Sequence, residues 1–103
     1  MIKMVKEIAG LCYELDKLYI HEKDKKKKQE IGKNFDIMSG LLDKAIRSQF
    51  DENDTVYKRS VRKLRKYSKM IREKTEQLER FERYFSGLSN LGEQLDELLA
   101  GSK

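Results

Sequence analysis

No proline interrupts the 103 residues of this chain, and that absence limits the possible folds more than any other feature. Proline is the strongest helix breaker, because it lacks a backbone donor and its ring clashes with the preceding turn. Lys, Glu, Leu, Arg and Gln, which all favour helices, are abundant. Apolar residues also recur at alternating steps of three and four, which is the helical period. The sequence therefore predicts an all-α protein.

The apolar spacing predicts four helices, of which the third is much the longest. They span residues about 2–20, 28–48, 55–85 and 89–100. A helix of roughly thirty residues would reach about 45 Å. Serine, asparagine and glycine between residues 85 and 92 indicate where this long helix ends.

Two breaks divide the predicted helices. Residues 51–54, DEND, form the clearer one, and Asp54 can cap the next helix by accepting a hydrogen bond from a backbone N–H. This break lies near the middle of the chain, so a helical hairpin follows from it. Residues 21–30, HEKDKKKKQE, contain no apolar residue. In one interpretation, the first helix continues through them without apolar contacts to support it. In the other, they form a loop or a kink, and this is favoured because the apolar stripe changes phase there.

We expect a single domain, residues 1–103, in which an antiparallel helical hairpin is extended into a three- or four-helix bundle. Charged residues make up 40% of the chain and hydrophobic residues 38%, which is more charge than an average globular chain carries. This balance indicates thin, solvated helices with little core. We therefore also expect a partner, and association with a second copy of the chain.

Positive charge is concentrated in residues 58–69, KRSVRKLRKYSK, where seven of twelve side chains are basic and none is acidic. Residues 55–74 carry a net charge of +8, so the other 83 residues sum to −3, given the total of +5. Like charges one turn apart destabilise a helix, so helix stability alone does not explain them. The predicted partner-binding face comprises Lys58, Arg59, Arg62, Lys63, Arg65, Lys66, Lys69 and Arg72.

Three interpretations of this basic face stay open. Acids such as Asp36, Asp43 and those of 51–54 could neutralise it within the molecule, or the face could be merely solvated. An acidic protein partner could bind it. Nucleic acid could also bind it non-specifically, because cations displace the counterions of phosphates. No helix-turn-helix turn, zinc spacing or RNA-recognition motif is present, and Tyr57 and Tyr67 fit the apolar stripe better than a base-stacking surface.

Residues suited to catalysis or metal binding are scarce. His21 and Cys12 are the only histidine and cysteine, and their spacing matches no zinc pattern. The Glu-x-x-His motifs of di-metal bundles and a glycine-rich phosphate loop are both missing. We expect Cys12 to be a small buried hydrophobe and His21 to be exposed. The sequence thus predicts no enzyme, no catalytic residue, no metal and no cofactor.

These observations favour a non-enzymatic protein-interaction module, such as an adaptor, inhibitor, immunity or chaperone-like factor, which binds an acidic partner through the basic face. The alternative is a non-specific nucleic-acid-binding helical protein that uses the same face. No apolar run approaches the roughly 18 residues of a membrane span, and charged residues interrupt the N-terminal stretch, unlike a signal peptide. We therefore expect a cytoplasmic protein that forms homo-oligomers and has no membrane partner.

Overall fold

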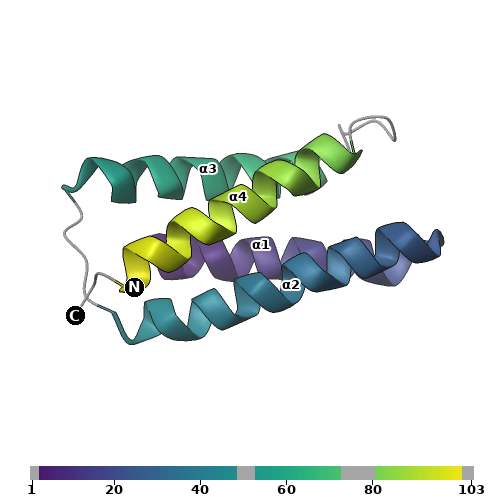
Figure 1. Cartoon of the computed structure of the whole chain (residues 1–103), viewed down its shortest axis with the longest axis horizontal. Coiled ribbons are helices and arrows are strands. Elements are labelled where there is room, and N and C mark those ends of the chain that lie inside the picture. The colour runs from purple at the N-terminus through teal and green to yellow at the C-terminus, as the bar shows by residue number, and fades with distance from the viewer. Residues whose placement is uncertain (1–2, 49–52, 73–80, 101–103) are drawn as a thin grey trace.

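The computed structural model describes residues 3–48, 53–72 and 81–100. These residues form four helices, α1 (Lys3–His21), α2 (Lys25–Ile46), α3 (Thr55–Arg72) and α4 (Phe81–Ala100). The helices pack into one bundle (Figure 1). The predicted all-α bundle is therefore confirmed, in its four-helix form.

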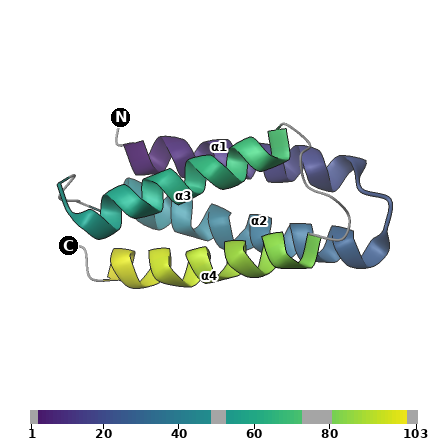
Figure 2. The same cartoon turned by 90° about the horizontal axis from the view of Figure 1, so that it is seen from above.

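Each helix of the bundle packs against two others. α1 and α4 both contact α2 and α3, so they occupy diagonally opposite positions, as do α2 and α3 (Figure 2). The chain direction alternates along the sequence, which makes α1 and α3 parallel neighbours (Figure 1). The N-terminal ends of α1 and α3 therefore lie at the same end of the bundle.

Buried apolar side chains from all four helices form the core, and the apolar stripes of the sequence supply them. The largest fully buried apolar residues are Met4, Ile8, Leu11, Leu15, Ile31, Met38, Leu64, Leu88, Leu91 and Leu95. Burying one such side chain stabilises a fold by about 1.5–3 kcal/mol. The four helices of a single chain cover these stripes. The expected self-association of the protein stays a prediction.

The lysine-rich segment 21–30 holds a short break followed by helix. α1 ends at His21, and the carboxylate of Asp24 accepts a hydrogen bond of 2.9 Å from the backbone N–H of Lys27. This capping bond satisfies one of the free donors at the start of α2. The helix then continues through the lysines, so the expected loop is confirmed only between His21 and Lys25.

The prediction of one continuous helix over 55–85 is wrong. α3 is described to Arg72 and α4 begins at Phe81, while residues 73–80 lie outside the described part of the chain. The hydroxyl of Tyr84 donates a hydrogen bond of 3.0 Å to the backbone carbonyl of Tyr67. In one straight helix, residues 17 positions apart would be separated by about 25 Å. The chain therefore reverses direction between α3 and α4.

The predicted helix end at residues 85–92 is also wrong, because α4 continues to Ala100. The glycines in this stretch permit close packing instead. A Cβ atom on Gly87 would overlap the hydroxyl of Tyr67, and one on Gly92 would lie 3.1 Å from Cγ2 of Ile37. Glycine thus serves the contacts of α4 with α3 and α2.

Candidate functional site

The basic face is presented by a capped, amphipathic α3. Asp54 Oδ1 accepts hydrogen bonds from the backbone N–H groups of Val56 and Tyr57, at 2.7 and 3.1 Å, which confirms its predicted capping role. The core-facing residues of the helix are Tyr57, Ser60, Val61, Leu64, Ser68 and Ile71. The eight predicted cations occupy the remaining circumference, where Lys63 is half-buried and the other seven are exposed.

Both tyrosines of α3 belong to the bundle rather than to its surface. Tyr57 is 2% exposed, and its hydroxyl accepts a hydrogen bond from the backbone N–H of Met4 at 3.3 Å. This N–H is one of the donors that the first turn of α1 leaves free. Tyr67 is half-buried and packs edge-to-face against Tyr84, with ring centroids 5.0 Å apart. Their interpretation as residues of the apolar stripe is confirmed.

Two of the eight cations are paired with carboxylates of α1. Nε and Nη2 of Arg65 both donate to Oε2 of Glu7, at 3.1 and 3.0 Å. Nε of Arg72 lies 3.3 Å from Oε2 of Glu14, whose other oxygen is 3.2 Å from Nζ of Lys17. Glu14 is buried, so two cations compensate a carboxylate that has lost most of its water.

The two ion pairs follow from the parallel packing of α1 and α3. Glu7 and Glu14 are seven residues apart, as are Arg65 and Arg72, and each pair spans 58 positions. Within the described part of the chain, neutralisation of the basic face is therefore partial, and the acids that supply it lie on α1. Of the acids expected to neutralise the face, Asp36, Asp43 and Asp54 form no ion pair with α3, and Asp51 and Glu52 lie outside the described residues.

Most of the other basic side chains of α3 are exposed to solvent. Five of the predicted side chains form no ion pair with any residue that the structure describes. These residues, which we call the outer cations, are Lys58, Arg59, Arg62, Lys63 and Lys66. Lys69 is exposed further along the same face. Apart from Val56 at the start of the helix, every exposed position of α3 is polar or charged.

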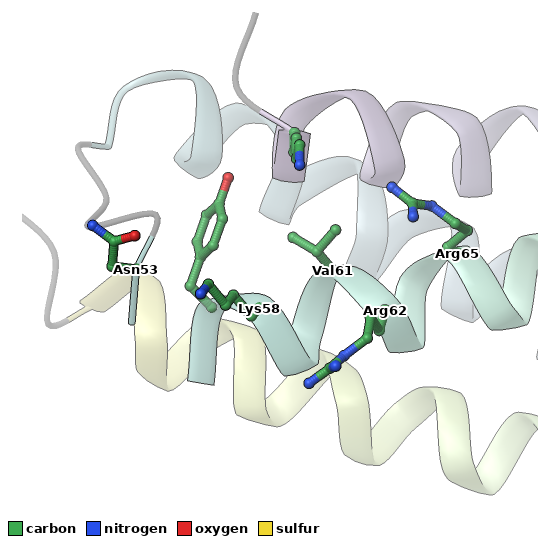
Figure 3. A pocket seen from close by; sticks show the side chains of 7 residues that line it. Asn53, Lys58, Val61, Arg62 and Arg65 are labelled. Carbon is green, nitrogen blue, oxygen red and sulfur yellow. The ribbon is translucent and has the colours of Figure 1, made fainter. Parts of the chain in front are cut away.

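A shallow pocket of about 460 Å³ opens between the N-terminal ends of α1 and α3 (Figure 3). It is lined by Lys3, Asn53, Tyr57, Lys58, Val61, Arg62 and Arg65. Asn53 lies at one end of the pocket, Arg65 at the other, and Val61 between them (Figure 3). The lining thus combines four cations with an amide and two largely buried side chains, and none of the described residues that line it is a carboxylate. Sequence reasoning did not include Asn53, which directly precedes the capping residue Asp54, or Lys3, which only the fold brings beside α3.

Cys12 and His21 are the two described residues with the greatest potential for chemistry. Cys12 is buried, as expected, and burial raises the pKa of its thiol to about 11. The thiol therefore stays protonated and poorly nucleophilic near neutral pH. His21 is exposed at the end of α1. Within the described ranges, no group of three or more His, Cys, Asp or Glu side chains is placed to hold a metal ion.

Of the helices that the structure describes, none combines the length and the apolar character that crossing a membrane would need. No protein-family model matches the sequence, and no curated protein or solved structure matches the chain. Function is therefore inferred from the side chains and charges of the bundle itself.

Proposed function

We propose that the protein is a non-enzymatic interaction module that binds an acidic helical segment of a partner protein through the basic face of α3. Uneven pairing of the face supports this proposal: α1 pairs Arg65 and Arg72, whereas the outer cations meet no described carboxylate. Like charges one turn apart destabilise a helix by about 0.2–0.5 kcal/mol per pair. Carboxylates of a partner would remove that repulsion.

The contact between α1 and α3 supplies a pattern for such an interaction. There, carboxylates seven residues apart on one helix meet arginines seven residues apart on its parallel neighbour. Arg59 and Lys66 repeat that separation on the outer side of α3. A partner helix with carboxylates at a seven-residue spacing would match these two side chains in the same way.

The composition of the face favours a complex that forms quickly and is sensitive to salt. Exposed ion pairs contribute about 0–1 kcal/mol each, and Val56 is the exposed apolar side chain that α3 could add. Charge complementarity of this kind raises the association rate more than the affinity. We therefore expect a weak complex whose formation slows as the ionic strength rises.

The test uses a fluorescent helical peptide with glutamates at seven-residue spacing, and an equally charged peptide in which the glutamates are redistributed. At low salt, fluorescence anisotropy should show tighter binding of the spaced peptide. Arg59→Glu with Lys66→Glu should weaken that binding at least about tenfold, which corresponds to 1.4 kcal/mol. The matched control, Lys25→Glu with Lys26→Glu, reverses the same amount of charge at exposed positions of α2. It should leave the affinity for the spaced peptide within about twofold of that of the unmodified protein.

The unmodified protein and the same two double variants also test the nucleic-acid alternative. Affinity for a random-sequence DNA duplex or RNA would fall steeply with salt, because each neutralised phosphate releases counterions. Strong duplex binding that Arg59→Glu with Lys66→Glu abolishes, together with no preference for the spaced peptide, would assign the face to nucleic acid. No binding of either peptide at low salt would reject the proposed function.

A further inference from the structure

We infer that the pocket between α1 and α3 binds a phosphate monoester. This inference goes beyond the proposed function. Lys58 and Arg62 belong to both surfaces, but Arg59 and Lys66, which are proposed to match the partner helix, do not line the pocket. The pocket would hold a small charged group at the end of the bundle.

The charge of the pocket favours a dianion. Lys3, Lys58 and Arg62 line it without forming an ion pair to any described residue. Arg65 is the fourth cation of the lining, and Glu7 offsets its charge while fixing its guanidinium. A phosphate monoester carries a charge of about −1.5 to −2 near pH 7, against −1 for a carboxylate. Three cations that no described carboxylate neutralises therefore match phosphate better than they match a carboxylate.

The types of donor also fit a phosphate group. The planar guanidinium of Arg62 can donate two parallel hydrogen bonds to phosphate oxygens. Lysine ammonium groups bind phosphate as mobile point charges, and the pocket takes one from each of the two helices, Lys3 from α1 and Lys58 from α3. The amide of Asn53 adds a further polar group at the end of the pocket (Figure 3).

The size and the floor of the pocket indicate that the phosphate is attached to an organic group. A water molecule takes up about 30 Å³ in the liquid, so a pocket of about 460 Å³ exceeds what a bare phosphate needs. Val61 and Tyr57 are 6% and 2% exposed and supply apolar surface beneath the cations. Carbon atoms that carry the phosphate could pack against these two side chains.

Both α1 and α3 begin at this end of the bundle (Figure 1), and the N-terminal end of α1 reinforces the positive potential, whereas Asp54 already caps that of α3. The N-terminal end of a helix carries a partial positive charge. The adjacent carboxylate of Asp54 is engaged with the backbone N–H groups of Val56 and Tyr57, and it is not among the residues that line the pocket.

The experiment is a titration, in chloride buffer, with inorganic phosphate, with a short phosphoserine peptide and with the unphosphorylated peptide, followed by amide chemical shifts in two-dimensional NMR. We expect saturable shifts at Asn53, Lys58 and Arg62 with the phosphopeptide and none with the unphosphorylated peptide. Equal saturation by inorganic phosphate would identify the free ion as a sufficient ligand. Response to the phosphopeptide alone would identify a phosphate on a carrier.

Two matched double variants decide whether the pocket itself binds the phosphate group. Lys58→Gln with Arg62→Gln should weaken phosphate binding at least about tenfold, and Arg59→Gln with Lys66→Gln should leave it within about twofold. Each variant removes two exposed charges from α3, and circular dichroism would check that both fold. An equal loss in the two variants, or no saturable shift in the unmodified protein, would overturn the inference. Binding of the spaced glutamate peptide should depend on Arg59 and Lys66. The proposed function and the proposed phosphate site can therefore fail independently of each other.

Discussion

The hydroxyl of Tyr84 on α4 donates a hydrogen bond to the backbone carbonyl of Tyr67 on α3, and the rings of the same two residues meet edge-to-face. Phe85 extends the cluster, with its ring centroid 4.8 Å from that of Tyr84. Edge-to-face aromatic pairs contribute about 0.5–1.5 kcal/mol beyond the area that they bury. This cluster fixes the antiparallel approach of α3 and α4.

Tyr84→Phe keeps the ring and removes the hydroxyl. We expect a loss of about 0.5–1.5 kcal/mol in the free energy of unfolding, the usual net contribution of one hydrogen bond. Urea denaturation followed by circular dichroism measures it. Tyr13→Phe is the matched control, because Tyr13 is 62% exposed, and it should change stability by less than about 0.5 kcal/mol. Equal effects of the two substitutions would contradict a specific role for the Tyr84 hydroxyl.

Gly87→Ala should be less stable than Gly40→Ala by at least about 1 kcal/mol. Both glycines lie within helices, where alanine is favoured by about 0.8–1.0 kcal/mol. A Cβ atom on Gly40 meets no heavy atom within 4 Å, whereas one on Gly87 would overlap the Tyr67 hydroxyl. Thermal and urea unfolding of the two variants provide the comparison. Restoration of stability when Gly87→Ala is combined with Tyr67→Phe would confirm that the hydroxyl is the obstacle.

Glu14→Gln should destabilise the bundle by about 1 kcal/mol, and Glu7→Gln by less than about 0.5 kcal/mol. The side chain of Glu14 is 7% exposed and faces both Arg72 and Lys17, while that of Glu7 is 18% exposed and faces Arg65. Arg72 and Arg65 are both mostly in solvent, which limits each contribution. Urea denaturation at low and high salt tests the ranking. A larger loss for Glu7→Gln would be inconsistent with burial as the deciding factor.

Stability should decline above pH 9 in a manner that depends on Cys12. The folded protein raises the pKa of this thiol from 9.0 to about 11, so the unfolded chain loses the proton first as the pH rises. The resulting stabilisation is complete below pH 9 and decreases by about 1 kcal/mol between pH 8 and pH 10. Burial also raises the pKa of Tyr67, which extends the decline to pH values above 10.

The measurement is the free energy of unfolding in urea at pH 8, 9 and 10. Cys12→Ala should be less stable than the unmodified protein at pH 8, and that difference should shrink as the pH rises. Parallel curves for the two proteins would show that the thiol does not contribute to the pH dependence.

The features that the sequence predicts correctly are local or periodic. Asp54 caps α3 through backbone groups two and three residues away, and the core of each helix follows from steps of three and four. The reversal after α3 has no such signal, because the stretch from Arg72 to Phe81 contains neither glycine nor proline. The contact between Tyr67 and Tyr84 is tertiary, so helical spacing alone could not reveal it.

The basic face was predictable as a set of residues but not in its pairing. Which cations are neutralised depends on α1 lying parallel to α3, and the matching repeats of Glu7–Glu14 and Arg65–Arg72 are the signal that could have indicated it. The pocket depends on Lys3 of α1 meeting α3, which no local pattern encodes, whereas Asn53 lies two residues before α3 in the sequence. Long-range contacts of this kind become visible only once the helices are placed.

The 58 positions that separate Glu14 from Arg72 also affect the order in which the chain can fold. During synthesis, α1 and α2 can form a hairpin before Arg72, which pairs with the carboxylate of Glu14, has been synthesised. The entropic cost of closing a loop rises only slowly with its length, so the order of synthesis matters more here than the separation along the chain. Glu14 therefore lacks Arg72 as a counter-ion until α3 has been synthesised, and the bundle can be completed only after that point.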